Sequence, residues 1–74
     1  MKEILIFLAA FGCHPAVEIV EVEHLSHPGA YVNGQIWLRP DADLGVLVHE
    51  LAHACGHDEA GAHRLETIWR NQDV

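Results

Sequence analysis

The chain has 74 residues, of which half are apolar and a fifth are charged. This balance excludes an intrinsically disordered segment, and the length allows one globular domain, residues 1–74. The formal net charge of −7 argues against a nucleic-acid surface, because such a surface needs clustered cations. The apolar run at residues 4–11 is too short for a membrane span, which needs about 20 apolar residues.

A domain of this size is expected to need stabilisation beyond its core. A hydrophobic core this small rarely contributes more than about 3 to 5 kcal/mol. A disulfide, an oligomer or a bound metal could add the rest. Cys13 and Cys55 allow one disulfide, but their spacing does not match a metal-binding knuckle. We expect a pair of reduced thiols in a cytoplasmic protein.

The first apolar run predicts a short N-terminal helix. Its apolar residues fall at i, i+3, i+4 and i+7: Ile4, Phe7, Leu8 and Phe11. Gly12 and His14-Pro15 are expected to end it, and a buried strand is the alternative. A secretory signal is disfavoured because Lys2 is cancelled by Glu3 and no small-x-small cleavage site follows, although secretion stays open.

A small sheet is predicted next. Residues 17–23 are rich in β-branched residues and alternate with acids in their second half, which predicts a strand with Glu21 and Glu23 facing solvent. Asn33-Gly34 lies between residues 30–32 and 35–38 and predicts a β-hairpin, because both residues tolerate the positive φ of a type I′ turn.

Two helices are predicted after Pro40. The first has Asp41 or Asp43 as its N-cap and is expected to end at Gly56. Its predicted buried face consists of Leu44, Leu47, Val48, Leu51, Ala52 and Cys55. Asp58 can cap the final helix, whose apolar stripe is Gly61, Ala62, Leu65, Ile68 and Trp69.

The pattern H-E-x-x-H, formed by His49, Glu50 and His53, lies on the first of these helices, nearly opposite its apolar face. Residues four apart share a helix face, so both imidazoles can reach one zinc ion with Glu50 beside a zinc-bound water. Zinc with three protein ligands keeps a position for water and lowers the pKa of that water to about 7. Glu50 would take its proton and pass it to a leaving amine.

A third ligand is expected beyond Gly56, because a straight helix cannot bring residues at i, i+4 and i+8 onto one ion. Glu59 is preferred, since it lies in the first turn of the final helix, where the returning chain can bring a carboxylate over the metal. His57, Asp58 and His63 are the alternatives. Asp58 is favoured as an N-cap, and His63 is either a surface residue or a hydrogen-bond donor to the site.

Residues 43–53, Asp-Leu-Gly-Val-Leu-Val-His-Glu-Leu-Ala-His, resemble the active-site helix of the zincin metallopeptidases. Residues 34–41 resemble the edge strand and lead-in of small zincins, including minigluzincins and ImmA/IrrE-type peptidases. Residues 59–63 are similar to the Glu-x-x-Ala-type segment whose glutamate is the third ligand in gluzincin-like families.

This resemblance implies His49, His53 and Glu59 as zinc ligands and Glu50 as the catalytic base. With the elements above, we expect an α+β, minimal zincin-like domain. A small antiparallel sheet with its hairpin would pack against the active-site helix and a C-terminal helix, beside the short N-terminal helix.

The preferred function is therefore a zinc metallopeptidase that cleaves a peptide or protein substrate, with the edge strand pairing with substrate backbone. One alternative is a non-catalytic, zinc-stabilised interaction module. The other, suggested by the ImmA-like resemblance, is a phage or mobile-element regulator that cleaves a repressor. Glu50 favours an enzyme, since a structural zinc prefers four closed protein ligands. Tyr31 is a secondary candidate as oxyanion donor. The substrate and the oligomeric state are left open.

Overall fold

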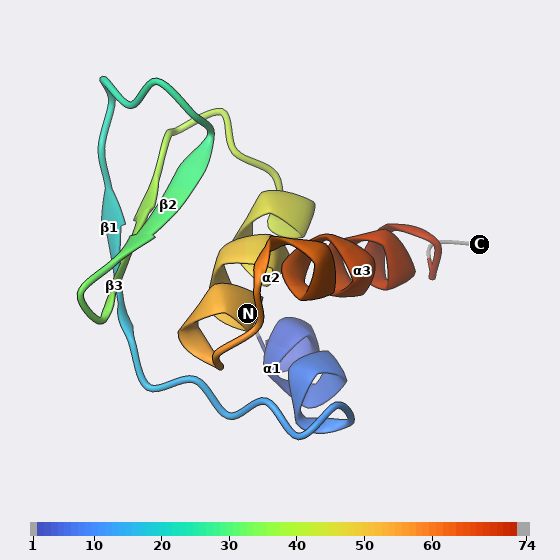
Figure 1. The fold of residues 1–74 in the computed structure, drawn as a ribbon. Helices are drawn as coiled ribbons and strands as arrows, with labels where there is room; N and C mark the ends of the chain where they lie inside the picture. The colour runs from blue at the N-terminus through green and yellow to red at the C-terminus, as the bar shows by residue number, and fades with distance from the viewer. Residues whose placement is uncertain (1, 73–74) are drawn as a thin grey trace.

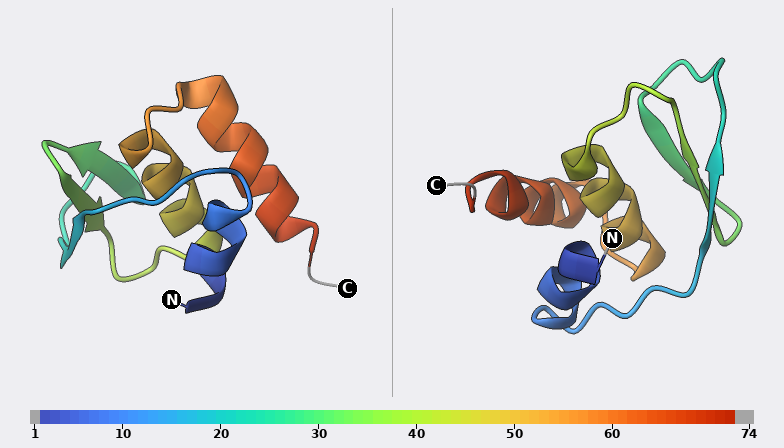
Figure 2. Two further views of the ribbon diagram at one scale, coloured as in Figure 1. Left: turned by 90° about the horizontal axis from the view of Figure 1, so that it is seen from below. Right: turned by 180° about the vertical axis from the view of Figure 1, so that it is seen from behind.

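The computed structural model describes residues 2–72, which form three helices and three strands. In chain order these are α1 (Lys2–Ala9), β1 (Glu18–Glu21), β2 (Gly29–Val32), β3 (Gln35–Leu38), α2 (Leu44–Ala54) and α3 (Glu59–Arg70). The views in Figures 1 and 2 agree that α2 lies between the sheet and α3, with α1 packed beside the two helices. The predicted α+β class is confirmed.

The sheet has the order β1-β3-β2. β2 and β3 form the predicted antiparallel hairpin, and Asn33 (φ 47°) and Gly34 (φ 81°) both have the left-handed backbone of its turn. The sheet is mixed rather than wholly antiparallel, because β1 pairs parallel with β3. The connection at residues 22–28 carries the chain past the place that β3 then fills (Figure 1). Glu21 and Glu23 are exposed, as predicted.

The core lies where the three helices meet the inner face of β3. Its buried members are Ile4, Phe7, Leu8, Cys13, Ile36, Leu47, Val48, Leu51, Ala52, Ala62 and Leu65. Two expected core residues lie elsewhere: Leu44 is 55% exposed and Phe11 is 45% exposed. Leu44 is the first residue of α2 and lines a surface groove, while Phe11 follows the end of α1 and packs against the ring of Phe7. Helical spacing predicts which residues share a face of the helix, but a residue is buried only where another element packs against that face.

Cys13 and Cys55 form a disulfide, with Cα atoms 5.6 Å apart, so the expectation of reduced thiols was wrong. Gly12, at φ 75°, turns the chain after α1 and brings Cys13 beneath the C-terminal end of α2. Cys55 is the C-cap of α2. Within residues 2–72, no helix is long and apolar enough to cross a bilayer.

Candidate metal centre

Local capping fixes both ends of the helix that presents the two histidines. At the start of α2, the Asp43 carboxylate accepts a hydrogen bond from the Val46 backbone N–H at 3.0 Å. At its end, the N–H of Gly56 donates to the His53 carbonyl at 2.9 Å and the N–H of His57 donates to the Ala52 carbonyl at 3.1 Å. This is a Schellman motif, which needs the left-handed φ of 95° at Gly56. The chain therefore turns back over α2 and begins α3 directly.

This reversal places Glu59 across from the two histidines. Its Oε1 lies 2.9 Å from Nε2 of His49 and 3.0 Å from Nε2 of His53. The three ligand atoms lie within 4.8 Å of one another, so the group could hold a metal ion. The structure thus brings together the three residues that were preferred as ligands from the sequence.

The other nitrogen of each ring is held by a group that can only accept a hydrogen bond. Nδ1–H of His49 donates to Oε1 of Glu66 at 2.8 Å, and Nδ1–H of His53 donates to the backbone carbonyl of His57 at 2.9 Å. In the neutral imidazole the proton is then on Nδ1, and Nε2 keeps its lone pair. Both rings consequently offer Nε2 to the same point.

Two nitrogen lone pairs and a carboxylate oxygen repel one another unless a cation lies between them. A metal ion bound at this point would supply the positive charge. Metal bonds of about 2.0 to 2.2 Å at angles of 90° to 109° separate neighbouring ligand atoms by about 2.8 to 3.6 Å. The separations of 2.9 and 3.0 Å meet that requirement. The donor set therefore fits a small divalent metal ion.

The charged groups of the site raise the pKa of His49 and lower the pKa of Glu59. Burial lowers the pKa of His49, but the carboxylates of Glu59 and Glu66 outweigh it, and the pKa is raised overall. The close contacts with His49 and His53 lower the pKa of Glu59, because a positively charged ring there donates to the ionised carboxylate, whose side chain is 77% exposed. Glu59 therefore stays ionised and available at the surface end of the site.

Glu50 is the one buried charged side chain among residues 3–72, whose burial the structure describes, at 9% exposure. Desolvation by burial raises its pKa despite the opposing effect of His49 and His53. It lines an open cleft of about 650 Å³ together with both histidines and Glu59. Gly29 of β2 lies directly against it, since a Cβ there would come within 3.1 Å of Cγ of Glu50.

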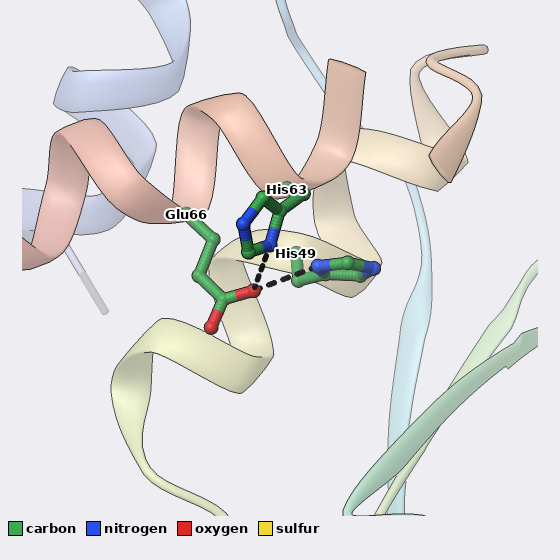
Figure 3. Close-up of side chains that lie close together, drawn as sticks. All are labelled: His49, His63 and Glu66. Atoms are coloured by element: carbon green, nitrogen blue, oxygen red, sulfur yellow. Dashed lines mark hydrogen bonds and ion pairs between the residues drawn. The ribbon is translucent and has the colours of Figure 1, made fainter. Parts of the chain in front are cut away.

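The residues considered as alternative third ligands lie outside the triangle formed by His49, His53 and Glu59. Asp58 is the N-cap of α3, as favoured, and accepts from the Gly61 N–H at 2.8 Å. His57 contributes its backbone carbonyl to His53. The His63 side chain is 71% exposed, and its Nδ1 lies 4.0 Å from Oε1 of Glu66 (Figure 3). Tyr31 lines the cleft from β2.

Glu66 is the site residue that sequence reasoning missed. Its position seven residues after Glu59 puts both carboxylates on one face of α3, two turns apart, which was the available signal.

A scan of the sequence against protein-family models, a search of curated proteins and a search of solved structures each found no match.

Proposed function

We propose that this protein is a zinc-dependent metallopeptidase of the zincin type. His49, His53 and Glu59 are the proposed zinc ligands, and Glu50 is the proposed catalytic base. The observation that supports this most is the meeting of two Nε2 atoms and one carboxylate oxygen in a cleft that Glu50 also lines. Two histidines and one carboxylate also suit Fe(II), but a glutamate beside the first histidine favours hydrolysis by zinc.

A zinc ion with three protein ligands would supply Lewis acidity toward a carbonyl oxygen and lower the pKa of water. Glu50 would accept the proton of the attacking water and transfer it to the leaving amine. Its low exposure keeps bulk water away from that carboxylate. His49 and His53 are held at Nδ1 and cannot replace Glu50 as the base while Nε2 serves as a ligand.

The expectation that residues 34–41 hold the edge strand was wrong, because β3 is the central strand of the sheet and β2 is at its edge. Substrate binding is therefore proposed along β2. This strand pairs with β3 on one side only, so its other edge is free to add a strand. Gly29 and Tyr31 of β2 line the same cleft as Glu50 and the two histidines. An extended peptide paired with β2 would thus pass over the proposed zinc site. The Tyr31 hydroxyl is a candidate to stabilise the developing oxyanion.

The disulfide is informative about the cellular compartment of the protein. Disulfides persist in oxidising compartments and are rare in the cytosol. We therefore favour secretion over the cytoplasmic location expected from the sequence. Thiol labelling of protein taken directly from its native compartment tests this, since free Cys13 and Cys55 there would contradict it.

The test of the enzyme is Glu50→Gln, which keeps the shape of the side chain and removes its basicity. We expect unchanged zinc content and a loss of about 10²- to 10⁴-fold in kcat/KM on an unfolded protein substrate. Glu23→Gln removes an exposed carboxylate from outside the cleft and should leave both unchanged. Equal cleavage by wild type and Glu50→Gln would refute the assigned base. Zinc binding without cleavage by either protein would favour the non-catalytic module.

A further inference from the structure

We propose that Glu66 is a positioning residue, which fixes the ring of His49 for metal binding and is itself held by Arg70. The proposal rests on the proposed metal site. It adds to that site Glu66 and Arg70, which both lie in the C-terminal half of α3.

Glu66 contacts His49 on the side of the ring that faces away from the other proposed ligands. Its Oε1 accepts from Nδ1–H of His49 at 2.8 Å, and its side chain is 17% exposed, compared with 77% for Glu59. Figure 3 shows the Glu66 carboxylate pointing from α3 toward the His49 ring on α2. A carboxylate at Nδ1 fixes the tautomer and makes Nε2 a more basic ligand.

Arg70 sets the direction of this carboxylate. Its Nη2 lies 2.7 Å from Oε2 of Glu66, and its Nε donates to the same oxygen at 2.9 Å. Oε2 is thus occupied by the guanidinium, which leaves Oε1 for His49.

The guanidinium is in turn fixed to the start of α2. Nη1 and Nη2 of Arg70 donate to the two carboxylate oxygens of Asp43, at 2.9 and 3.1 Å. The group lies over Gly45, where an added Cβ would be 2.3 Å from Cζ. Only glycine at position 45 leaves room for Arg70 there. A continuous set of contacts therefore runs from the N-cap of α2 through α3 to His49.

His49, His63 and Glu66 could instead be taken for a second metal site, since their ligand atoms also lie close together. Two observations oppose that. His49 would have to lose its Nδ1 proton while Nε2 faces the first site, and the Arg70 cation already occupies Glu66. His63 is exposed and 4.0 Å from Glu66, so it adds little to either arrangement.

The experiment measures zinc affinity by competition with a chromogenic chelator, in wild type and in Glu66→Gln. We expect the variant to bind zinc about 10- to 100-fold more weakly. His63→Gln changes a neighbour of Glu66 outside the proposed set and should stay within about twofold of wild type. The visible spectrum of the cobalt-substituted protein should change in Glu66→Gln, because the field of the His49 ligand changes, and stay unchanged in His63→Gln.

Gly45→Ala provides a second variant that alters no polar side chain. Its new Cβ must displace the Arg70 guanidinium, so zinc binding should weaken in the same direction as in Glu66→Gln, by a smaller factor. This variant decides the matter if Glu66→Gln does not fold. A folded variant of either kind with wild-type zinc affinity and an unchanged cobalt spectrum overturns the positioning role and leaves the metal site standing. A wild-type chain that binds no zinc overturns both.

Discussion

Reduction of the disulfide between Cys13 and Cys55 is expected to remove a large share of the stability of the metal-free protein. The two cysteines are 42 residues apart in sequence, and closing a loop of that size removes about 4 kcal/mol of conformational entropy from the unfolded chain. A domain of 74 residues has a total free energy of unfolding of about 4 to 11 kcal/mol. The bond therefore contributes a large share of the total.

The assay is urea unfolding of the metal-free protein, followed by far-ultraviolet circular dichroism with and without a phosphine reductant. We expect the free energy of unfolding to fall by about 3 to 4 kcal/mol on reduction. The double variant Cys13→Ala, Cys55→Ala should not respond to the reductant. A fall of less than about 1 kcal/mol, with the disulfide verified by mass before reduction, would refute the loop-closure argument.

Zinc should offset part of this loss in the reduced protein. An ion that binds only the folded state adds about 2.7 kcal/mol at a free concentration 100 times Kd. The oxidised protein should gain a similar increment. This comparison separates the two sources of stability, because one acts on the unfolded chain and the other on the folded site.

Three further predictions concern the site and its supports. Gly29→Ala, whose Cβ would lie 2.8 Å from Cγ1 of Val46 and 3.1 Å from Cγ of Glu50, should lower kcat and leave zinc affinity near wild type, as separate kinetic and chelator measurements would show. The hydrogen bond from Arg70 lowers the pKa of Asp43 below 3.8, so its contribution is complete above that value and is lost as pH falls through the lower folded pKa. Urea unfolding between pH 2 and 7 should show a smaller loss of stability at acid pH in Asp43→Asn than in wild type, by about 1 kcal/mol or less because the pair is exposed. Removal of metal with a chelator should abolish cleavage and lower Tm, and added zinc should restore both; cleavage that persists without metal would contradict the proposed reaction.

The elements that local chemistry specifies were predictable from the sequence. Asn33-Gly34 can hardly be read except as a tight hairpin turn, and Gly56 after a helical pattern indicates a left-handed helix end. The placement of Glu59 followed from the same glycine, because a Schellman turn returns the chain over the helix that it ends. Short-range signals thus sufficed for the hairpin and for the ligand triangle.

The features that depend on distant partners were not predictable. The parallel pairing of β1 with β3 is decided by the path of residues 22–28, for which the alternation in residues 17–23 holds no information. The disulfide likewise depends on how α1 packs beneath α2, and two cysteines 42 residues apart give no sign of that distance. Leu44 follows helical spacing perfectly and is exposed, because burial depends on what lies opposite.

The two proposed histidine ligands are held by different parts of the fold. His53 is held by the His57 carbonyl in the turn after α2, and that turn follows directly on Cys55, which the disulfide fixes to the segment after α1. His49 is held by Glu66, which depends on α3 lying along α2. The contacts that stabilise this small core are therefore the same ones that orient the ligands.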